Sequence, residues 1–172
     1  MSEEKLFTIL AEVEHRPGVL FRVSNLFRRR AFNIESISIG PAGTRDADVA
    51  RMTITVRGEE KDVEQLIKQL LKLVDVIDAV RLHPKTSVSR ELALVKLSTK
   101  DARARSDVFN LVSAFRGNIV DVSADSVIAE IVGDAEKIDA FIELTREFGL
   151  EEVSRTGVTA QRRGRRSTHP KG

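Results

Sequence analysis

The chain has 172 residues, of which 41% are hydrophobic, enough to build a packed core in one domain or two small ones. It contains no cysteine, which excludes disulfides, thiolate nucleophiles and thiolate metal sites and fits a reducing compartment. Residues 161–172 carry five Lys or Arg and no acid, so the other 23 basic and 26 acidic residues form a mildly acidic body. The acidic start and the absence of a long apolar run predict a soluble cytoplasmic protein.

The first half of the chain alternates between strand and helix patterns. Alternating apolar residues predict strands over residues 6–14, 34–39, 51–57 and 76–82. Two apolar stripes at helical spacing predict the helices between them, namely Val19, Leu20, Val23, Leu26 and Phe27, and then Val63, Leu66, Ile67, Leu70, Leu71 and Val74. The order strand, helix, strand, strand, helix, strand is that of a ferredoxin-like split βαβ module.

The turn before the first helix has the composition of an anion site. Pro17 fixes φ and lacks an N–H, which suits a first helical turn where that donor would be unpaired. Gly18 lets the backbone approach a ligand closely. A helix N-terminus also presents unpaired N–H groups and a partial positive charge. The turn is therefore suited to a small carboxylate, although an ordinary strand-to-helix turn has the same sequence.

A second copy of the pattern follows a short polar linker at residues 83–90. It predicts strands over 92–97, 118–122, 126–132 and 150–158 and helices over 104–115 and 135–148. Shifted by 85 residues, Val23, Asn25, Leu26, Asn33 and Ile34 fall on Val108, Asn110, Leu111, Asn118 and Ile119. Gly18 falls on Arg103, so we expect the second copy to have lost the ligand turn.

These patterns predict an α+β chain of two tandem ferredoxin-like modules, each an antiparallel sheet with helices on one face. The predicted divisions are residues 1–83, residues 84–160 and a basic flexible tail at 161–172. Because helices cover one face of each sheet, the other face or an edge strand favours a homodimer or higher homo-oligomer.

The sequence shows no constellation that would carry catalysis or bind a metal. His15, His83 and His169 are far apart in the pattern, and there is no Walker loop, GxGxxG or GxSxG motif. We therefore expect no catalytic residue, metal or cofactor in this chain. The eight Phe are predicted to be core residues or helix anchors, which favours a solubilising basic tail over an RNA-binding sheet.

Four segments, taken in order, resemble a known family. They are EVEHRPGVLFRVSNLFRRRAFNIESISIG, RMTITVRGEEKDVEQLIKQLLKLVDVIDAVRL, RELALVKL and AFRGNIVDVSADS. These segments are similar to the small regulatory subunit of acetolactate (acetohydroxyacid) synthase, and the first half resembles an ACT domain, an amino-acid-binding ferredoxin-like module. The resemblance runs from about Leu6 to Arg163, which makes it far more specific than the Pro-Gly turn alone.

The resemblance implies a catalytic large subunit on a separate chain, which uses thiamine diphosphate, magnesium and FAD in valine, leucine and isoleucine synthesis. It also implies that this chain activates that subunit and confers feedback inhibition by valine, bound between two ACT domains. The effector-binding positions implied for this sequence are His15, Pro17, Gly18, Val19, Leu20, Asn33 and Ile34. The family usually has Asn or Asp where this chain has His15, which leaves the identity of the effector open.

Two other functions remain open on the sequence. A stand-alone ACT-type sensor that regulates another enzyme or a transcription factor would carry the same first module. An RNA-binding module would require affinity that falls with salt and with deletion of the tail. The resemblance implies neither a nucleic-acid nor a membrane partner, and the second module is expected to mediate assembly or contact with the catalytic subunit.

Overall fold

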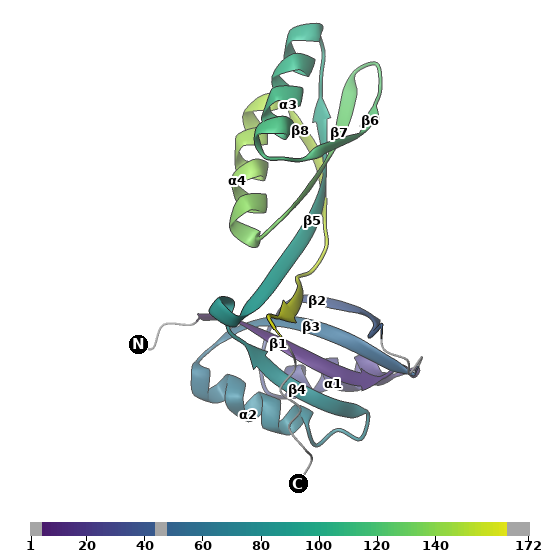
Figure 1. Ribbon diagram of the computed structural model, residues 1–172, viewed down its shortest axis with the longest axis vertical. Helices are drawn as coiled ribbons and strands as arrows, with labels where there is room; N and C mark the ends of the chain where they lie inside the picture. The colour runs from purple at the N-terminus through teal and green to yellow at the C-terminus, as the bar shows by residue number, and fades with distance from the viewer. Residues whose placement is uncertain (1–4, 44–47, 165–172) are drawn as a thin grey trace. The chain divides into compact units, whose positions relative to one another are not determined.

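The computed structural model describes residues 5–43 and 48–164, and the chain divides into two compact units (Figure 1). The first unit comprises Met1–Val88 and Val158–Gly172, and the second comprises Ser89–Gly157. The division therefore falls five residues later than the predicted boundary between residues 83 and 84. The chain also returns to the first unit at its C-terminal end, which the sequence pattern did not predict.

The first unit has the predicted module order. Its elements are β1 (Lys5–Glu14), α1 (Val19–Arg29), β2 (Ile34–Pro41), β3 (Val49–Gly58), α2 (Glu60–Leu70) and β4 (Val76–Leu82). The strands form one antiparallel sheet in the order β2-β3-β1-β4, and α1 and α2 cover one of its faces (Figure 1). This arrangement confirms the ferredoxin-like fold.

The core of the first unit follows from the two periodicities in the sequence. Alternate residues of β1 are buried against the helices, and α1 buries Val19, Val23 and Phe27 on the same core. Each such side chain contributes about 1.5–3 kcal/mol through burial. Three positions of the predicted stripes are wrong. Leu20 of α1 is 44% exposed. Leu71 and Val74 are 46% and 88% exposed because α2 ends at Leu70.

The second unit repeats this architecture. After the short helix η1 (Pro84–Thr86) come β5 (Ser87–Ser98), α3 (Ala102–Ala114), β6 (Asn118–Val122), β7 (Ser126–Gly133), α4 (Ala135–Thr145), η2 (Arg146–Phe148) and β8 (Leu150–Arg155). The strand order β6-β7-β5-β8 matches that of the first unit element by element. The strand order thus confirms the two tandem modules.

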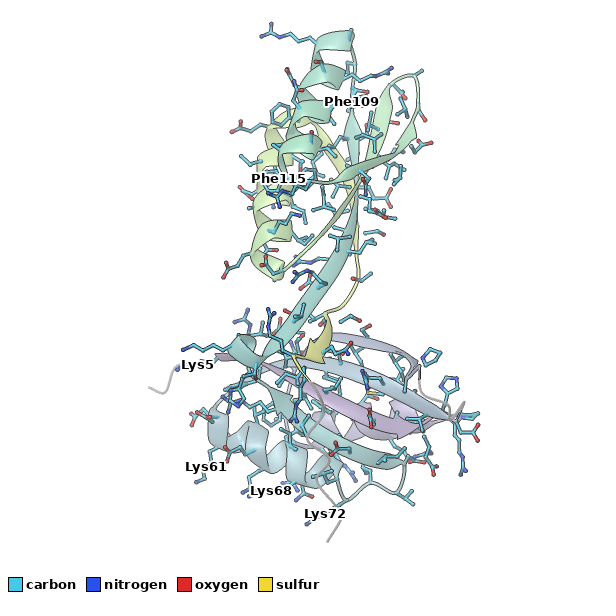
Figure 2. All side chains as sticks on the ribbon, in the orientation of Figure 1. Lys5, Lys61, Lys68, Lys72, Phe109 and Phe115 are labelled. Carbon is cyan, nitrogen blue, oxygen red and sulfur yellow. The ribbon has the colours of Figure 1, made fainter. Side chains whose placement is uncertain are left out.

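Side chains on the helices separate into core and solvent faces (Figure 2). Phe115 packs edge-on against Phe141 with a ring separation of 5.2 Å, whereas Phe109 is 39% exposed. Phe21 is 68% exposed on α1. The expectation that all eight Phe are core residues or helix anchors is therefore wrong for Phe21 and Phe109.

The last strand, β9 (Thr159–Arg162), covers part of the open face of the first sheet. Ala160 is 5% exposed and packs with Leu10 and Leu82, both of which point away from the helices. β9 pairs with β5, and the Arg163 amide donates a 2.9 Å hydrogen bond to the Thr86 carbonyl oxygen. We call residues 158–163 the C-terminal strap.

The structure of the strap differs from the predicted bounds of the last strand and of the C-terminal tail. The strand predicted over 150–158 ends at Arg155, and a separate strand begins at Thr159. Gln161 and Arg162 belong to that strand and not to a tail. The physical reason is the apolar surface of Leu10 and Leu82, which β9 removes from solvent. The rest of the predicted tail, residues 165–172, lies outside the described residues.

We predict that Leu10→Ala destabilises the first unit by about 2 kcal/mol or more, because it leaves a cavity beneath the strap. The matched control is Leu6→Ala, on the same face of the same strand but 49% exposed, which should stay within about 0.5 kcal/mol of the wild type. Chemical denaturation of the full chain measures both. Equal effects would show that the strap does not cover Leu10 in solution.

Candidate functional site

The turn from β1 into α1 presents an uncapped helix N-terminus. Gly18 is the N-cap residue and has φ 85° and ψ −7°, a left-handed conformation that strains any residue with a Cβ. No side chain caps the described part of this helix, and its first turn contains no acidic residue. The Val19 amide donates a 3.4 Å hydrogen bond to the Arg16 carbonyl oxygen, and no side-chain cap or first-turn carboxylate offsets the partial positive charge of this helix end.

Two backbone hydrogen bonds hold the turn in place. The Glu14 amide donates to the Asp75 carbonyl oxygen at 2.8 Å, and the His15 amide donates to the Asp48 carbonyl oxygen at 2.6 Å. His15 and Pro17 are exposed, whereas Val19 is buried in the core beneath the turn. The turn is thus anchored to two neighbouring loops while its outer surface stays accessible.

An ion pair connects α1 to the loop after α2. The Arg22 guanidinium donates from Nε and Nη2 to the two carboxylate oxygens of Asp75, at 2.5 and 2.8 Å. A Cβ built on Gly18 would lie 2.9 Å from Arg22 Nη1, so the cation lies directly beside the turn. Arg22 therefore adds positive potential at the helix N-terminus, and any side chain at position 18 would meet the guanidinium.

The same contact changes the proton affinity of both groups. The side-chain hydrogen bond with Arg22 lowers the pKa of Asp75 below its usual value of 3.8, and Asp75 in turn raises the pKa of Arg22. Asp75 is 6% exposed, and it stays ionised in this surrounding because a guanidinium pairs with both of its oxygens.

The other predicted residues lie at the opposite end of the sheet. Ile34 is paired with Val56, which is paired with Phe7, so Ile34 is level with the start of β1. Glu14, next to the turn, is seven residues further along, or about 23 Å at about 3.3 Å per residue. The fold brings the residues of the turn together and keeps Asn33 beside Ile34. It does not bring the two groups together within one chain.

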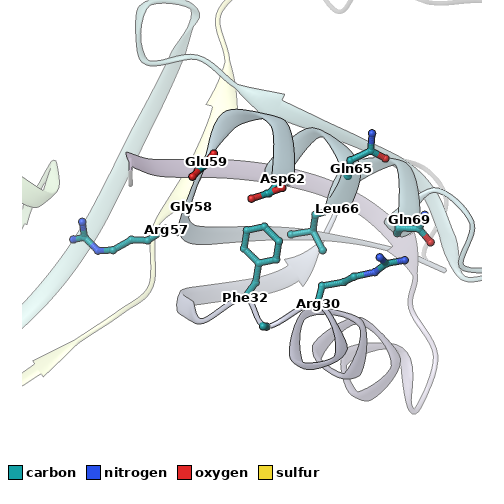
Figure 3. A pocket seen from close by; sticks show the side chains of 10 residues that line it. Arg30, Phe32, Arg57, Gly58, Glu59, Asp62, Gln65, Leu66 and Gln69 are labelled. Atoms are coloured by element: carbon teal, nitrogen blue, oxygen red, sulfur yellow. The ribbon is translucent and has the colours of Figure 1, made fainter. Parts of the chain in front are cut away.

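A hollow of about 410 Å³ lies near the end of α1 and the start of α2 (Figure 3). Phe32 and Leu66 provide its apolar lining, and Arg30 extends toward Gln69. A Cβ on Gly58 would lie 2.8 Å from the Phe32 ring, so glycine is needed there to seat the ring. None of the seven predicted effector-binding residues lines this hollow, so it does not define their site.

The second unit differs at the corresponding turn. The Asp101 carboxylate accepts a 2.8 Å hydrogen bond from the Ala104 amide and thereby caps α3. Arg103, which matches Gly18 in the repeat, is exposed on the first turn of that helix. Because the Asp101 carboxylate already accepts from a first-turn amide, this geometry supports the expectation that the second copy lacks a ligand turn.

Comparison with known proteins identifies the family. Residues 9–78 match the family described as the AHAS small subunit-like ACT domain, and residues 90–164 match the small subunit of acetolactate synthase. A probable acetolactate synthase small subunit of Methanothermobacter thermautotrophicus is 51% identical over 159 residues, covering 92% of this chain and 94% of the relative. The chain belongs to the acetolactate synthase small-subunit family.

Other members of the small-subunit family agree in sequence and in structure. The acetolactate synthase small subunit of Bacillus subtilis is 43% identical, covering 91% of this chain and 90% of the relative. The crystal structure of the small subunit from Thermotoga maritima superposes with a TM-score of 0.85 at 39% identity, covering 94% of this chain and 99% of that one. The resemblance found in the sequence is thus confirmed over nearly the whole chain.

By its family, this chain is a small subunit of acetolactate synthase that contains an ACT domain. This implies a catalytic large subunit as its partner. No described helix is long and apolar enough to span a membrane. Sequence reasoning missed the pair of Arg22 and Asp75, which lie 53 residues apart. A signal that could have indicated the contact is the spacing of Arg22 four residues after Gly18, which places both on the same side of the helix.

We predict that Asp75→Asn lowers the melting temperature at neutral pH, and that the difference from the wild type shrinks as the pH falls below about 3.8. The pKa of Asp75 is lower in the folded than in the unfolded chain. Its stabilising contribution is therefore present above the unfolded pKa and is lost as the pH falls through the folded one. Thermal melts from pH 2 to 7 measure this, with the exposed Asp107→Asn as control. A difference that does not vary with pH would contradict the prediction.

Proposed function

We propose that this chain is the non-catalytic regulatory subunit that activates the acetolactate synthase catalytic subunit and confers feedback inhibition by valine. The observation that carries the proposal is the uncapped, left-handed turn at Gly18 in a chain of this family. Such a turn suits a ligand carboxylate, and an amino acid that is a product of the pathway supplies one.

In this proposal, the carboxylate, the ammonium group and the side chain of valine each contact a different part of the chain. The backbone amides of Gly18, Val19 and Leu20, with Arg22 beside them, suit the carboxylate. The backbone carbonyls near Asn33 and Ile34 suit the ammonium group. The partly exposed side chains of Leu20 and Ile34 suit a branched aliphatic side chain, with His15 and Pro17 at the rim.

Sheet topology supports a site shared by two copies of the chain. β2 is the edge strand and, within residues 5–43 and 48–164, pairs only with β3. Its far end at Pro41 is level with Val13, close to the Gly18 turn. Antiparallel pairing of two β2 edges about a twofold axis places the start of one β2 beside the far end of the other. Asn33 and Ile34 of one copy would then lie at the turn of its partner.

The chemistry of the synthase belongs in this proposal to the large subunit, which is expected to hold thiamine diphosphate, magnesium and FAD. In the described part of this chain, no group of three or more His, Asp or Glu has a geometry suited to a metal ion. We propose that the complex works in the cytoplasm, where branched-chain amino acids are made, and that this chain binds neither nucleic acid nor membrane.

The decisive experiment measures the conversion of pyruvate to acetolactate by the cognate catalytic subunit, with and without this chain, each with and without valine. The proposal predicts stimulation by this chain and inhibition by valine only when it is present. Stimulation of the catalytic subunit without inhibition by valine would support the subunit role but refute valine as the effector. His15 would then be the first position to examine. No effect under any condition would favour a stand-alone amino-acid sensor.

We predict that Gly18→Asp abolishes the valine response and leaves the stimulation of the catalytic subunit within about twofold of the wild type. Aspartate is strained at φ 85°, its Cβ meets Arg22 Nη1, and its carboxylate competes with the effector for the same amides. Arg103→Asp, at the matching position of the second unit, is the control and should retain full inhibition. Loss of inhibition in both variants would show that the effect is not local to the turn.

We predict that Ile39→Lys weakens both self-association and the valine response. Ile39 is 44% exposed on the β2 edge, and a lysine there opposes strand pairing. Molar mass from light scattering and the valine inhibition curve are the two readouts. The control is Val122→Lys on the edge strand β6 of the second unit, where the native side chain is 51% exposed. A loss of mass in the control variant alone would assign the interface to the second unit.

A further inference from the structure

The C-terminal strap is hydrogen-bonded to β2, the strand that begins at Ile34 directly after Asn33. The Ser36 hydroxyl lies 2.7 Å from the Thr55 hydroxyl and accepts a 3.3 Å hydrogen bond from the Val158 amide. The Ser38 hydroxyl lies 3.3 Å from that of Thr159. Both serines lie on the open face of β2, because their partners Thr55 and Thr53 on β3 point away from the helices. The strap therefore contacts β2 two and four residues after Ile34.

The strap rests on a small hydrophobic cluster separate from the main core. Leu10, Leu82 and Ala160 are its buried members, and Val80 and Val158 pack at its edge. Beneath the strap, Thr55 is only 2% exposed although it lies on the polar face of the sheet. A segment held by so few apolar contacts opens at a much lower free energy than the main core does. We therefore expect a seated and an unseated state of the strap while the first unit stays folded.

The strap also lies on the covalent path between the two units. Val158 follows Gly157, the last residue of the second unit, and the first unit ends its other continuous segment at Val88, inside β5. β9 pairs with β5, and Arg163 donates from Nε to the Ser87 carbonyl oxygen at 3.1 Å. Both chain connections between the units therefore run through the strap and its strand partner.

We propose that Ser36, Ser38 and Thr159 are positioning residues that link occupancy of the effector site to the seating of the C-terminal strap. The inference rests on the proposed function. Ligand contacts at Asn33 and Ile34 order the start of β2 and fix the Ser36 and Ser38 hydroxyls, which lowers the cost of seating the strap. The seated strap is then hydrogen-bonded to Thr86 and Ser87 of the first unit, at the start of β5. By linkage, the ligand favours the seated state as much as that state favours the ligand.

The main test separates valine binding from valine inhibition, using the full chain with its catalytic subunit. Ala160→Asp puts a carboxylate against Leu10 and Leu82 and unseats the strap. We expect the valine concentration for half-inhibition to rise at least tenfold, while stimulation of the catalytic subunit stays within twofold. Calorimetry should still detect valine binding, weakened by a smaller factor than the rise in the half-inhibitory concentration. Unchanged inhibition in a variant that retains its main-core melting transition would overturn the proposal.

A matched pair of milder variants identifies the hydroxyl contact. Thr159→Val removes the hydroxyl at constant shape and should raise the half-inhibitory valine concentration about threefold, whereas Thr159→Ser keeps the hydroxyl and should restore the wild-type curve. A role in stability alone would move the melting temperature without this pattern of loss and rescue. Equal inhibition curves for the two variants would exclude Thr159 from the linkage.

Amide hydrogen exchange measures the opening of the strap directly in the wild-type chain. With saturating valine, amide exchange in residues 158–163 should slow, and exchange in the helices of the second unit should serve as the internal reference. Exchange that is unchanged or faster while calorimetry shows valine bound would overturn the proposal. If calorimetry and inhibition both show no valine effect on the wild type, the proposed effector function fails first, and the strap link fails with it.

Discussion

The packing of α1 across the first sheet is the constraint on which the functional features of this chain depend. Burial of Val19, Val23 and Phe27 fixes which face of the helix packs on the sheet. The chain must then turn within four residues between Glu14 and Val19, and the left-handed backbone at Gly18 closes that turn. Because no side chain caps this helix within the described structure, the same geometry that completes the fold leaves a positively polarised surface open to a ligand.

The two units share one fold but differ at the turn that is proposed to bind the effector in the first unit. Their strand orders are equivalent, and their cores arise from the same alternation of apolar residues. They differ, among other places, at the residue that caps the first helix of each unit. Gly18 begins α1 without a side-chain acceptor, whereas the Asp101 carboxylate accepts from the Ala104 amide and satisfies α3 from within. A cap that stabilises a helix by about 1 kcal/mol also removes the site where an external carboxylate would bind.

The open face of the first sheet is neither bare nor fully apolar. Its serines and threonines need hydrogen-bond partners, and its few apolar residues, Leu10 and Leu82 among them, need cover. The strap meets both needs with one short strand, because its backbone and Thr159 bond to the serines while Ala160 packs on the leucines. A polar face covered by hydrogen bonds and a few methyl groups is well suited to opening and closing, since little apolar area is exposed when it opens.

The sequence by itself determined the two modules, their strand and helix order and the family, because period-2 and period-3.6 patterns and turn residues are local properties of the chain. It also indicated the Gly18 turn, since a Pro-Gly pair before an apolar helix has a local meaning. It could not place Asp75 against Arg22, 53 residues away, or return residues 158–163 to the first sheet, because such contacts depend on packing between distant segments. The tertiary structure alone decided that Ile34 and Gly18 lie at opposite ends of one sheet, since strand register sets that distance and adjacent sequence does not.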